Sequence, residues 1–164
     1  MTAEPINIRQ ADSDDITVLS SLIRYSFRTV AERFNLTSEK CPKHPSNCTE
    51  EWIQNDVFRG VVYYILECNG IPAGCAALEK APPDLSYLER LAVLPEVRKR
   101  GFGKTLVNHV FDQAKDSGAR QMSIGIVSDD IELKGWYRKV GFVEGETKEF
   151  THLPFMVTFM TYEL

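Results

Sequence analysis

A basic segment that contains two glycines, Arg-Lys-Arg-Gly-Phe-Gly at residues 98–103, lies between two apolar patterns of different period. The run 87–94 before it is typical of a strand, and Pro95 ends it. After it, apolar residues recur at helical spacing as far as Gly118, namely Leu106, Val107, Val110, Phe111 and Ala114. Glycines at a helix N-terminus let a ligand approach the free backbone N–H groups, and these groups favour phosphate. The sequence therefore predicts a site for a phosphorylated cofactor.

The spacing of the glycines excludes two common nucleotide-binding loops. A Walker A loop requires a glycine five positions before the Gly-Lys-Thr at 103–105, and Arg98 stands there. The dinucleotide fingerprint requires a glycine or alanine at the position that Leu106 occupies. What remains is Arg-x-x-Gly-x-Gly after a strand that ends in Val-x-Pro.

This pattern resembles the coenzyme A pyrophosphate loop of the GNAT superfamily of N-acetyltransferases. A second segment, residues 129–142, resembles the superfamily's short helix with a tyrosine, here Tyr137, followed by Gly-Phe. The family commonly has an asparagine seven residues before that tyrosine. Asp130 occupies this position, and a carboxylate cannot donate a hydrogen bond as an amide does. Both motifs occur in the family's order, so the resemblance extends from about Tyr87 to the C-terminus.

Length and composition are those of an ordinary globular chain. The 164 residues fit one N-acetyltransferase domain, residues 1–164, and 43% of them are apolar. No apolar stretch approaches the roughly 18 residues of a membrane helix, and the N-terminus lacks the pattern of a secretory signal. With four cysteines and no export signal, we expect reduced thiols and a cytoplasmic protein. The net charge of −4 argues against a general nucleic-acid surface.

The order of the expected elements indicates an α/β (α+β) single domain with a mixed central sheet flanked by helices. A helix capped by Asp12 or Ser13 extends to about Val30, and Thr49 caps a second helix that ends near residue 58. Asn-Gly at 69–70 predicts a hairpin. The resemblance implies the acyl-CoA N-acyltransferase (GNAT) fold, in which the sheet is splayed at the strand that contains Leu91. We expect strands at about 6–9, 61–67, 71–79, 87–94, 121–127, 143–150 and 154–162.

Acyl transfer from a thioester requires that the accepting amine lose a proton. An unperturbed lysine-like amine has a pKa of about 10.4, so its neutral form costs roughly 4.6 kcal/mol at pH 7. A general base can take the proton, and Glu89 is our candidate. The resemblance places a residue that faces the acceptor there or at Tyr87, which strand alternation puts on the same face. Glu79, Glu67, a chain of waters, or a Glu89 that is only solvated or paired remain alternatives.

The leaving thiolate requires a proton, and Tyr137 is the expected donor. A phenol of pKa about 10 is protonated at pH 7, and the resemblance puts this tyrosine near the cofactor sulfur. The resemblance also has the strand at 91–93 pair with the pantetheine arm, with an amide near Leu91 or Ala92 polarising the thioester carbonyl. The residues that it assigns to the cofactor are Leu91, Ala92, Val93, Arg98, Lys99, Arg100, Gly101, Phe102, Gly103, Lys104, Thr105, Asp130 and Tyr137.

The loop from about Thr37 to Cys48 contains Cys41, His44 and Cys48. These residues could supply three zinc ligands, but no Cys-x-x-Cys pair accompanies them, and we expect no metal. The alternative is a proline-stiffened loop with half-buried cysteines. In the superfamily the corresponding connection helps to form the acceptor site, so His44 is a candidate acceptor contact, as is Tyr87.

Together these features predict an acetyl-CoA-dependent N-acetyltransferase that moves the acetyl group to a primary amine by direct attack in a ternary complex. The alternatives are a non-catalytic acyl-CoA-binding or sensor domain and, less favoured, a nucleotide-binding protein that uses Gly-Lys-Thr at 103–105. A free amino acid, a polyamine, an aminoglycoside and a protein amine all fit as acceptor, and the fold does not choose among them. The resemblance is compatible with a homodimer, and we expect neither a nucleic-acid nor a membrane partner.

Overall fold

The computed structural model describes residues 5–164, and its strands form one seven-stranded sheet. The strands are β1 (Ile6–Gln10), β2 (Val62–Cys68), β3 (Ile71–Ala81), β4 (Leu85–Val93), β5 (Gln121–Val127), β6 (Val143–Glu149) and β7 (Met156–Glu163). They lie in the order β1-β2-β3-β4-β5-β7-β6, and every neighbouring pair is antiparallel except β4 and β5. The mixed α/β sheet predicted from the sequence is confirmed.

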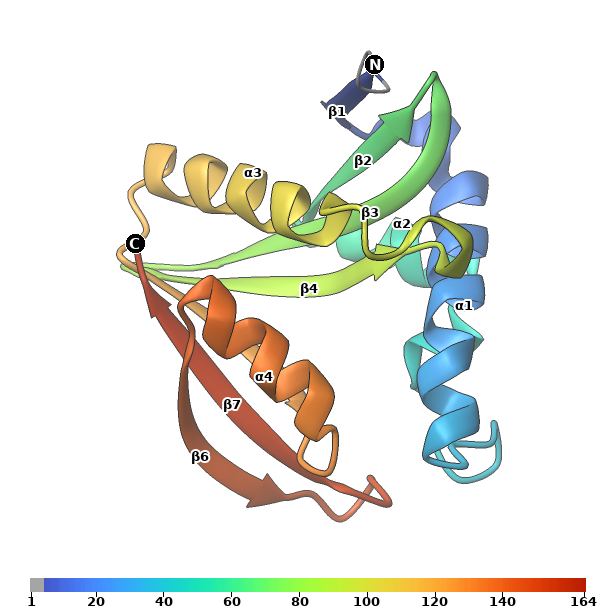
Figure 1. Ribbon diagram of the computed structural model, residues 1–164, viewed down its shortest axis with the longest axis vertical. Helices are drawn as coiled ribbons and strands as arrows, with labels where there is room; N and C mark the ends of the chain where they lie inside the picture. Colours follow the sequence, from blue (N-terminus) through green and yellow to red (C-terminus); the bar gives the residue numbers. More distant parts are fainter. Residues whose placement is uncertain (1–4) are drawn as a thin grey trace.

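The parallel pair in the middle of the sheet is joined at one end only. β4 and β5 pair from Leu85 opposite Gln121 to Tyr87 opposite Ser123, and no farther. Beyond Tyr87 the two strands diverge, so that the sheet opens into a V away from the C-terminus (Figure 1). The register between β3 and β4 also shifts before the end of β4, where Arg90 has a φ of +49°. Such a bulge bends its strand, and the splay implied by the resemblance is present.

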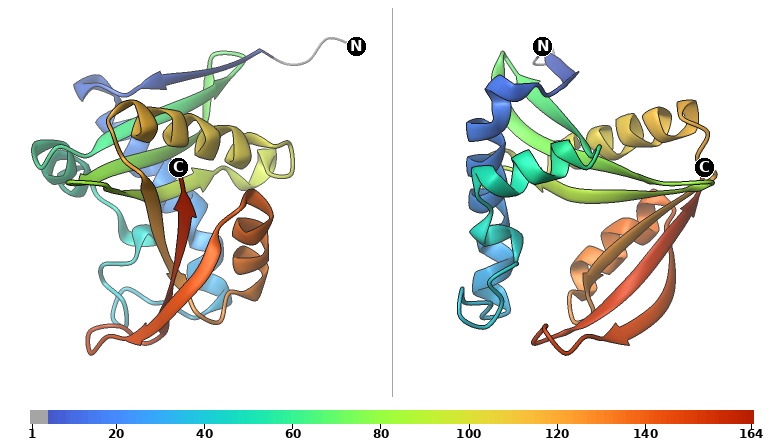
Figure 2. Two further views of the ribbon diagram at one scale, coloured as in Figure 1. Left: turned by 90° about the vertical axis from the view of Figure 1, so that its left-hand side faces the viewer. Right: turned by 180° about the vertical axis from the view of Figure 1, so that it is seen from behind.

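Among the described residues, four α-helices cover the sheet: α1 (Ile16–Arg33), α2 (Glu50–Phe58), α3 (Phe102–Asp116) and α4 (Ile131–Val140). Helix α3 lies on one face of β2–β4, α1 and α2 lie on the other face, and α4 packs beside the β5–β7 arm (Figures 1 and 2). Short 3-10 turns precede α1, α2 and α3 at Ser13–Asp15, Pro45–Asn47 and Pro95–Val97.

The polar residues predicted as helix caps act as caps. Asp12 accepts a hydrogen bond from the Asp14 amide at 2.9 Å and forms a capping box with Asp15 at the turn that leads into α1. Thr49 caps α2 by accepting from the Trp52 amide at 3.3 Å. Each side chain satisfies a backbone donor that the first turn leaves free, at the start of the 3-10 turn before α1 for Asp12 and at the start of α2 for Thr49.

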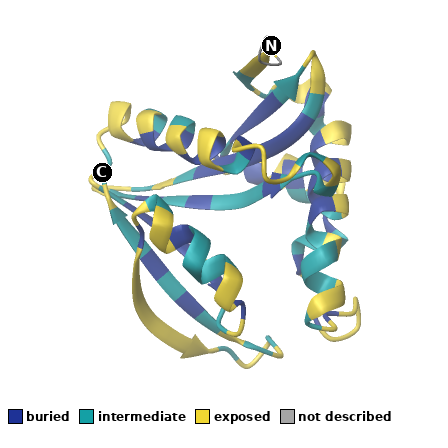
Figure 3. Ribbon diagram, viewed as in Figure 1, coloured by how far each residue is buried: buried dark blue, intermediate teal, exposed yellow. Residues whose placement is uncertain are grey.

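Two apolar clusters lie on opposite faces of the sheet. One joins α3 to the sheet and to Tyr137 of α4, with Leu106, Val107 and Val110 completely buried. The other joins α1 and α2 to the sheet through Leu19, Ile23, Ile53 and Ile65. Strand β6 is exposed along its whole length, whereas the inward faces of β2 and β3 are buried (Figure 3). Within residues 5–164, no helix is long and apolar enough to cross a membrane.

Candidate active site

Two cavities adjoin strand β4, and the larger of them occupies the opening between β4 and β5. It has a volume of about 740 Å³ and runs from the N-terminus of α3 past the diverging strands to α1. Residues 88–93 of β4 form one wall, and residues 124–127 of β5 form the opposite wall. Because the strands no longer pair there, β4 has backbone groups available to a bound molecule.

The loop before α3 has a backbone conformation that lets a bound molecule approach its N–H groups closely. Gly101 has a φ of +83° and Lys99 a φ of +66°, and both line the larger cavity. A Cβ atom on Gly103 would lie 3.2 Å from the Trp136 ring, so glycine lets this helix start pack against α4. The first N–H groups of α3 have no acceptor within the helix and lie at the cavity, which suits a phosphate group.

Arg98 connects this loop to the rest of the cleft. Its guanidinium donates to the Val93 carbonyl at 2.9 Å, to the Ser26 carbonyl at 2.8 Å and to the Thr29 hydroxyl at 3.2 Å. Val93 is the last residue of β4, and the other two acceptors lie on α1. The side chain therefore holds the loop, the strand and α1 together, in addition to the charge that it brings to the cavity.

Most of the residues predicted to hold the cofactor meet at this cavity. Arg100 and Thr105 are not among its lining residues, and the Thr105 hydroxyl instead donates to the Gly101 carbonyl at 2.9 Å. Phe102 touches the cavity, but its side chain is buried in the core beside α3. The residues that line the cavity as predicted are Leu91, Ala92, Val93, Arg98, Lys99, Gly101, Gly103, Lys104, Asp130 and Tyr137.

Asp130, which replaces the family's asparagine, is engaged on two sides. Its carboxylate accepts from the Leu133 amide at 3.1 Å as the N-cap of α4, and it pairs with Arg33 at 3.1 Å. Arg33 is the last residue of α1, so this ion pair joins the two walls of the larger cavity. The guanidinium and the N-terminal end of the α4 dipole both compensate the buried carboxylate.

Tyr137 lies on the α4 wall of the same cavity and is almost fully buried. Its ring is held edge-on between Trp136 and Phe142, with centroid distances of 4.9 and 5.2 Å. Burial raises the pKa of the phenol above its ordinary value, because the charged form would lose hydration. The hydroxyl is therefore protonated at neutral pH, as a proton donor requires.

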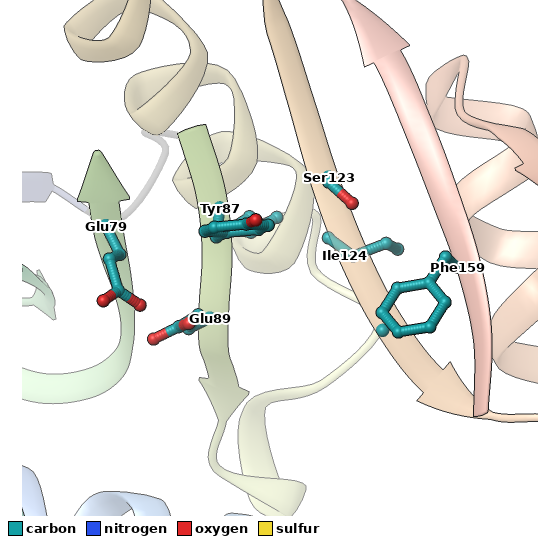
Figure 4. A pocket seen from close by; sticks show the side chains of 8 residues that line it. Glu79, Tyr87, Glu89, Ser123, Ile124 and Phe159 are labelled. Carbon is teal, nitrogen blue, oxygen red and sulfur yellow. The ribbon is translucent and has the colours of Figure 1, made fainter. Parts of the chain in front are cut away.

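Glu89 lies where the larger cavity meets a smaller one of about 330 Å³. Figure 4 shows Glu79 of β3 and Glu89 of β4 turned toward each other at one side of the smaller cavity. Burial and the neighbouring Glu79 carboxylate raise the pKa of Glu89 to about 8. A carboxylate with such a pKa is a much stronger base than ordinary glutamate.

A charge network behind Glu79 and Glu89 connects them to α2. Arg59 pairs with Glu79 at 2.5 Å and with Asp56 at 2.8 Å. The buried Asp56 also pairs with Arg90 at 3.2 Å and accepts from the Tyr63 hydroxyl at 2.5 Å. Glu89 itself has no ion pair with Arg90, whose guanidinium is turned toward Asp56 and the Trp52 ring.

The loop between α1 and α2 contributes His44 to the larger cavity. Burial lowers the pKa of His44 to about 4, so its ring is neutral at physiological pH. Cys41 and Cys48 are fully buried rather than half-buried as predicted, and burial raises the pKa of both thiols. Among residues 5–164, no group of three or more His, Cys, Asp or Glu side chains is arranged to hold a metal ion.

Several residues of the site carried no local sequence signal. Ser123 and Phe159 reach the smaller cavity from β5 and β7, and Phe27 reaches the larger one from α1. Pairing of β3 with β4 brings Glu79 opposite Tyr87, which the hairpin and strand alternation could have indicated. Glu67, the other alternative base, is outside the site, because it pairs with Arg9 at 3.4 Å at the β1 edge.

Comparison with known proteins agrees with this geometry. The model of the acetyltransferase (GNAT) family matches residues 27–142, more than half of the chain, and the chain belongs to this family. An amino-acid acetyltransferase of Neisseria meningitidis is 31% identical over 118 residues, which cover 71% of this chain and 23% of that protein. The uncharacterized N-acetyltransferase YvbK of Bacillus subtilis is 36% identical over 70 residues, 43% of this chain and 45% of YvbK. The chain spans less than half the length of these relatives.

Solved structures share the fold over nearly the whole chain. The PaiA N-acetyltransferase of Thermoplasma acidophilum, solved in complex with coenzyme A, matches with a TM-score of 0.79 at 19% identity, covering 98% of this chain and 99% of that one. The ribosomal-protein-S18-alanine N-acetyltransferase of Escherichia coli matches with a TM-score of 0.75 at 16% identity, covering 97% and 94%. At these identities the likeness establishes the fold alone.

Proposed function

We propose that this protein is an acetyl-CoA-dependent N-acetyltransferase that acts on a primary amine. The observation that carries the proposal is the continuity of one cavity. It begins at the N-terminus of α3, passes the unpaired part of β4 and reaches Glu89, with Tyr137 on its wall. Membership of the GNAT family and the coenzyme A complex of a protein with the same fold support this function.

The residues around the loop fit a pyrophosphate and its pantetheine arm. The free N–H groups of the first α3 turn and the charges of Lys99 and Lys104 would bind the phosphates. Gly101 leaves the backbone uncovered, and the β5-facing edge of residues 91–93, where β4 has no strand partner, would hydrogen-bond the arm. Acetyl-CoA would supply the activated thioester, and the protein's own groups would position it and transfer the protons.

Glu89 accepts a proton from the ammonium of the acceptor, so that the nitrogen lone pair can attack the thioester carbonyl carbon. An amide near Leu91 or Ala92 stabilises the negative charge that develops on the carbonyl oxygen. As the carbon–sulfur bond breaks, the electron pair leaves with sulfur, and Tyr137 donates the proton that yields free CoA thiol. The second proton that the attacking nitrogen loses passes to solvent, from which Tyr137 recovers its own. The acetyl group remains on the nitrogen as an amide.

Amine-dependent release of CoA tests this function directly. Purified protein is incubated with acetyl-CoA and a panel of primary amines, and the free thiol and the acetylated product are measured. We expect thiol and N-acetyl product in equal amounts. Binding of acetyl-CoA with no thiol release from any amine would contradict catalysis and favour a sensor domain. Absence of acetyl-CoA binding would contradict the assignment of the loop.

A further inference from the structure

The smaller cavity contacts Glu89 but lies outside the path assigned to acetyl-CoA. Its wall on one arm carries Glu79 of β3 with Tyr87 and Glu89 of β4, and its wall on the other arm carries Ser123 and Phe159 (Figure 4). These five side chains extend the site away from the thioester position near Leu91. We propose that this cavity binds the second amino group of an acceptor that carries two cationic amines joined by a short aliphatic chain. This inference rests on the proposed acetyltransferase function.

The charges around the cavity favour a cation. Within the part of the chain that the structure describes, none of its eight lining residues is Lys, Arg or His, whereas two are glutamates. Arg59, which pairs with Glu79 at 2.5 Å, is not among the lining residues, and the Glu79 carboxylate still raises the pKa of Glu89. An acceptor carboxylate would find no positive side chain in the lining and would lie beside Glu79. An α-amino acid is therefore a poor fit, whereas a second ammonium group is attracted to the same carboxylates.

Ser123 provides an independent indication that a polar group binds. The residue is only 8% exposed, and the structure gives its hydroxyl no hydrogen bond to another described residue, so this polar group is free to meet a molecule in the cavity. Because the residue lines the cavity, an ammonium N–H group of the acceptor is a suitable donor to it.

Two aromatic side chains complete the environment. Tyr87 and Phe159 approach the cavity from opposite arms of the sheet (Figure 4). An ammonium over an aromatic face gains about 0.5–2 kcal/mol, and the apolar ring edges suit a methylene chain between two amino groups. Rings alone would also admit an uncharged alkyl group. The glutamates and the unpartnered hydroxyl make the cation the better occupant.

The strand geometry sets the length of the acceptor. Tyr87 and Glu89 are two residues apart on β4, which corresponds to about 7 Å along a strand. The reacting amine lies near Glu89, and the second amine lies near Tyr87 and Ser123. A chain of about four carbons joins nitrogens over such a distance, so 1,4-diaminobutane is the appropriate probe.

Three probes of equal chain length isolate the end group. We would compare kcat/KM for 1,4-diaminobutane, n-butylamine and 4-aminobutyrate, whose far ends are cationic, neutral and anionic. We expect the diamine to exceed the monoamine by at least about tenfold, beyond the advantage of its two equivalent amines, and 4-aminobutyrate to be the poorest. Equal or better turnover of either other probe would overturn the inference while the acetyltransferase function stands.

Variants test whether the smaller cavity causes the preference. Glu79→Gln and Ser123→Ala should each reduce the ratio of diamine to monoamine kcat/KM severalfold, mainly through KM for the diamine. Asp116→Asn, an exposed charge at the far end of α3, is the matched control and should leave the ratio unchanged. A ratio that is unchanged in Glu79→Gln would overturn the inference.

A binding measurement separates this inference from the function itself. If no amine releases CoA, 1,4-diaminobutane is titrated calorimetrically into the protein saturated with CoA. Binding by the wild type that is weakened in Glu79→Gln and in Ser123→Ala would support the diamine site even though the transferase had failed. No binding, or equal binding by the variants, would overturn the site as well.

Discussion

The two cavities of the cleft are built in different ways, although they share Glu89. Backbone groups of a single loop and helix start dominate the end of the larger cavity that we assign to the cofactor phosphates. The smaller cavity consists of side chains from β3, β4, β5 and β7, which are distant in the sequence. A binding surface made of backbone tolerates many side-chain changes but few changes at glycine. A surface made of side chains can change its ligand through single substitutions, and this is where family members with one fold can differ in acceptor.

Glu89→Gln should have the largest effect, because it removes the proton acceptor and little else. We expect kcat/KM to fall by about 10²–10³-fold. In the wild type, kcat/KM should rise with pH up to about 8, because Glu89 must lose its proton to act as a base. The variant should lack this inflection. An unchanged pH profile in Glu89→Gln would mean that another group or a water chain takes the proton.

The same variant makes a prediction about stability. The pKa of Glu89 is raised from an ordinary value of 4.5 to about 8 in the folded protein. Between these pH values the unfolded chain loses the proton that the folded protein retains, so this residue makes stability fall as pH rises. Glu89→Gln should weaken that pH dependence, which thermal unfolding from pH 5 to 9 would measure.

Tyr137→Phe should have a somewhat smaller effect on the chemical step. The substitution preserves the ring that packs against Trp136 and Phe142, and it removes only the proton donor. We expect kcat to fall by about 10²-fold with acetyl-CoA affinity retained, because a thiolate is already a fair leaving group. Unchanged single-turnover rates would remove Tyr137 from the mechanism.

Gly101→Val should weaken acetyl-CoA binding by at least about tenfold. Gly101 has a φ of +83°, a conformation that valine adopts only with strain, and the new side chain would cover the loop backbone at the cavity. Gly118→Val is the matched control, because its φ of +94° brings similar strain after the end of α3 and outside both cavities. Both variants should lose thermal stability, but only Gly101→Val should lose affinity in calorimetry.

Arg98→Lys should have the smallest effect on function. Lysine keeps the charge but cannot serve the three acceptors on Val93, Ser26 and Thr29 at once. We expect unfolding stability to fall by about 1–2 kcal/mol and acetyl-CoA affinity to fall only a few-fold. A large loss of affinity without loss of stability would show that the guanidinium acts on the phosphates directly.

The difference between the cavities also explains what the sequence could predict. The places of the loop at 98–103 and of Tyr137 were predictable because they depend on local spacing within or beside one helix. Ser123 and Phe159 were not, because only the pairing of β5 with β7 and the divergence of β4 bring them opposite Glu79. Glu89 could be predicted only in part. Its position on the strand follows from the sequence, but its raised pKa depends on burial and on Glu79 of the neighbouring strand β3.

Asp130 and Arg98 illustrate the same limit on a smaller scale. Sequence spacing assigned both to the cofactor, yet Asp130 is also the cap of α4 and the partner of Arg33. Arg98 is likewise tied to α1. Contacts between α1 and the loop or α4 join residues roughly 70–100 positions apart, and no local pattern encodes them.

The cofactor end of the cleft and the catalytic Glu89 should act separately. The most direct test is a paired titration of wild type and Glu89→Gln with acetyl-CoA, followed by addition of an accepted amine to the same samples. We predict equal dissociation constants for acetyl-CoA in the two proteins and rapid CoA release in the wild type alone. Loss of acetyl-CoA binding in Glu89→Gln, or undiminished CoA release by it, would contradict the separation of a backbone-built cofactor end from a catalytic Glu89.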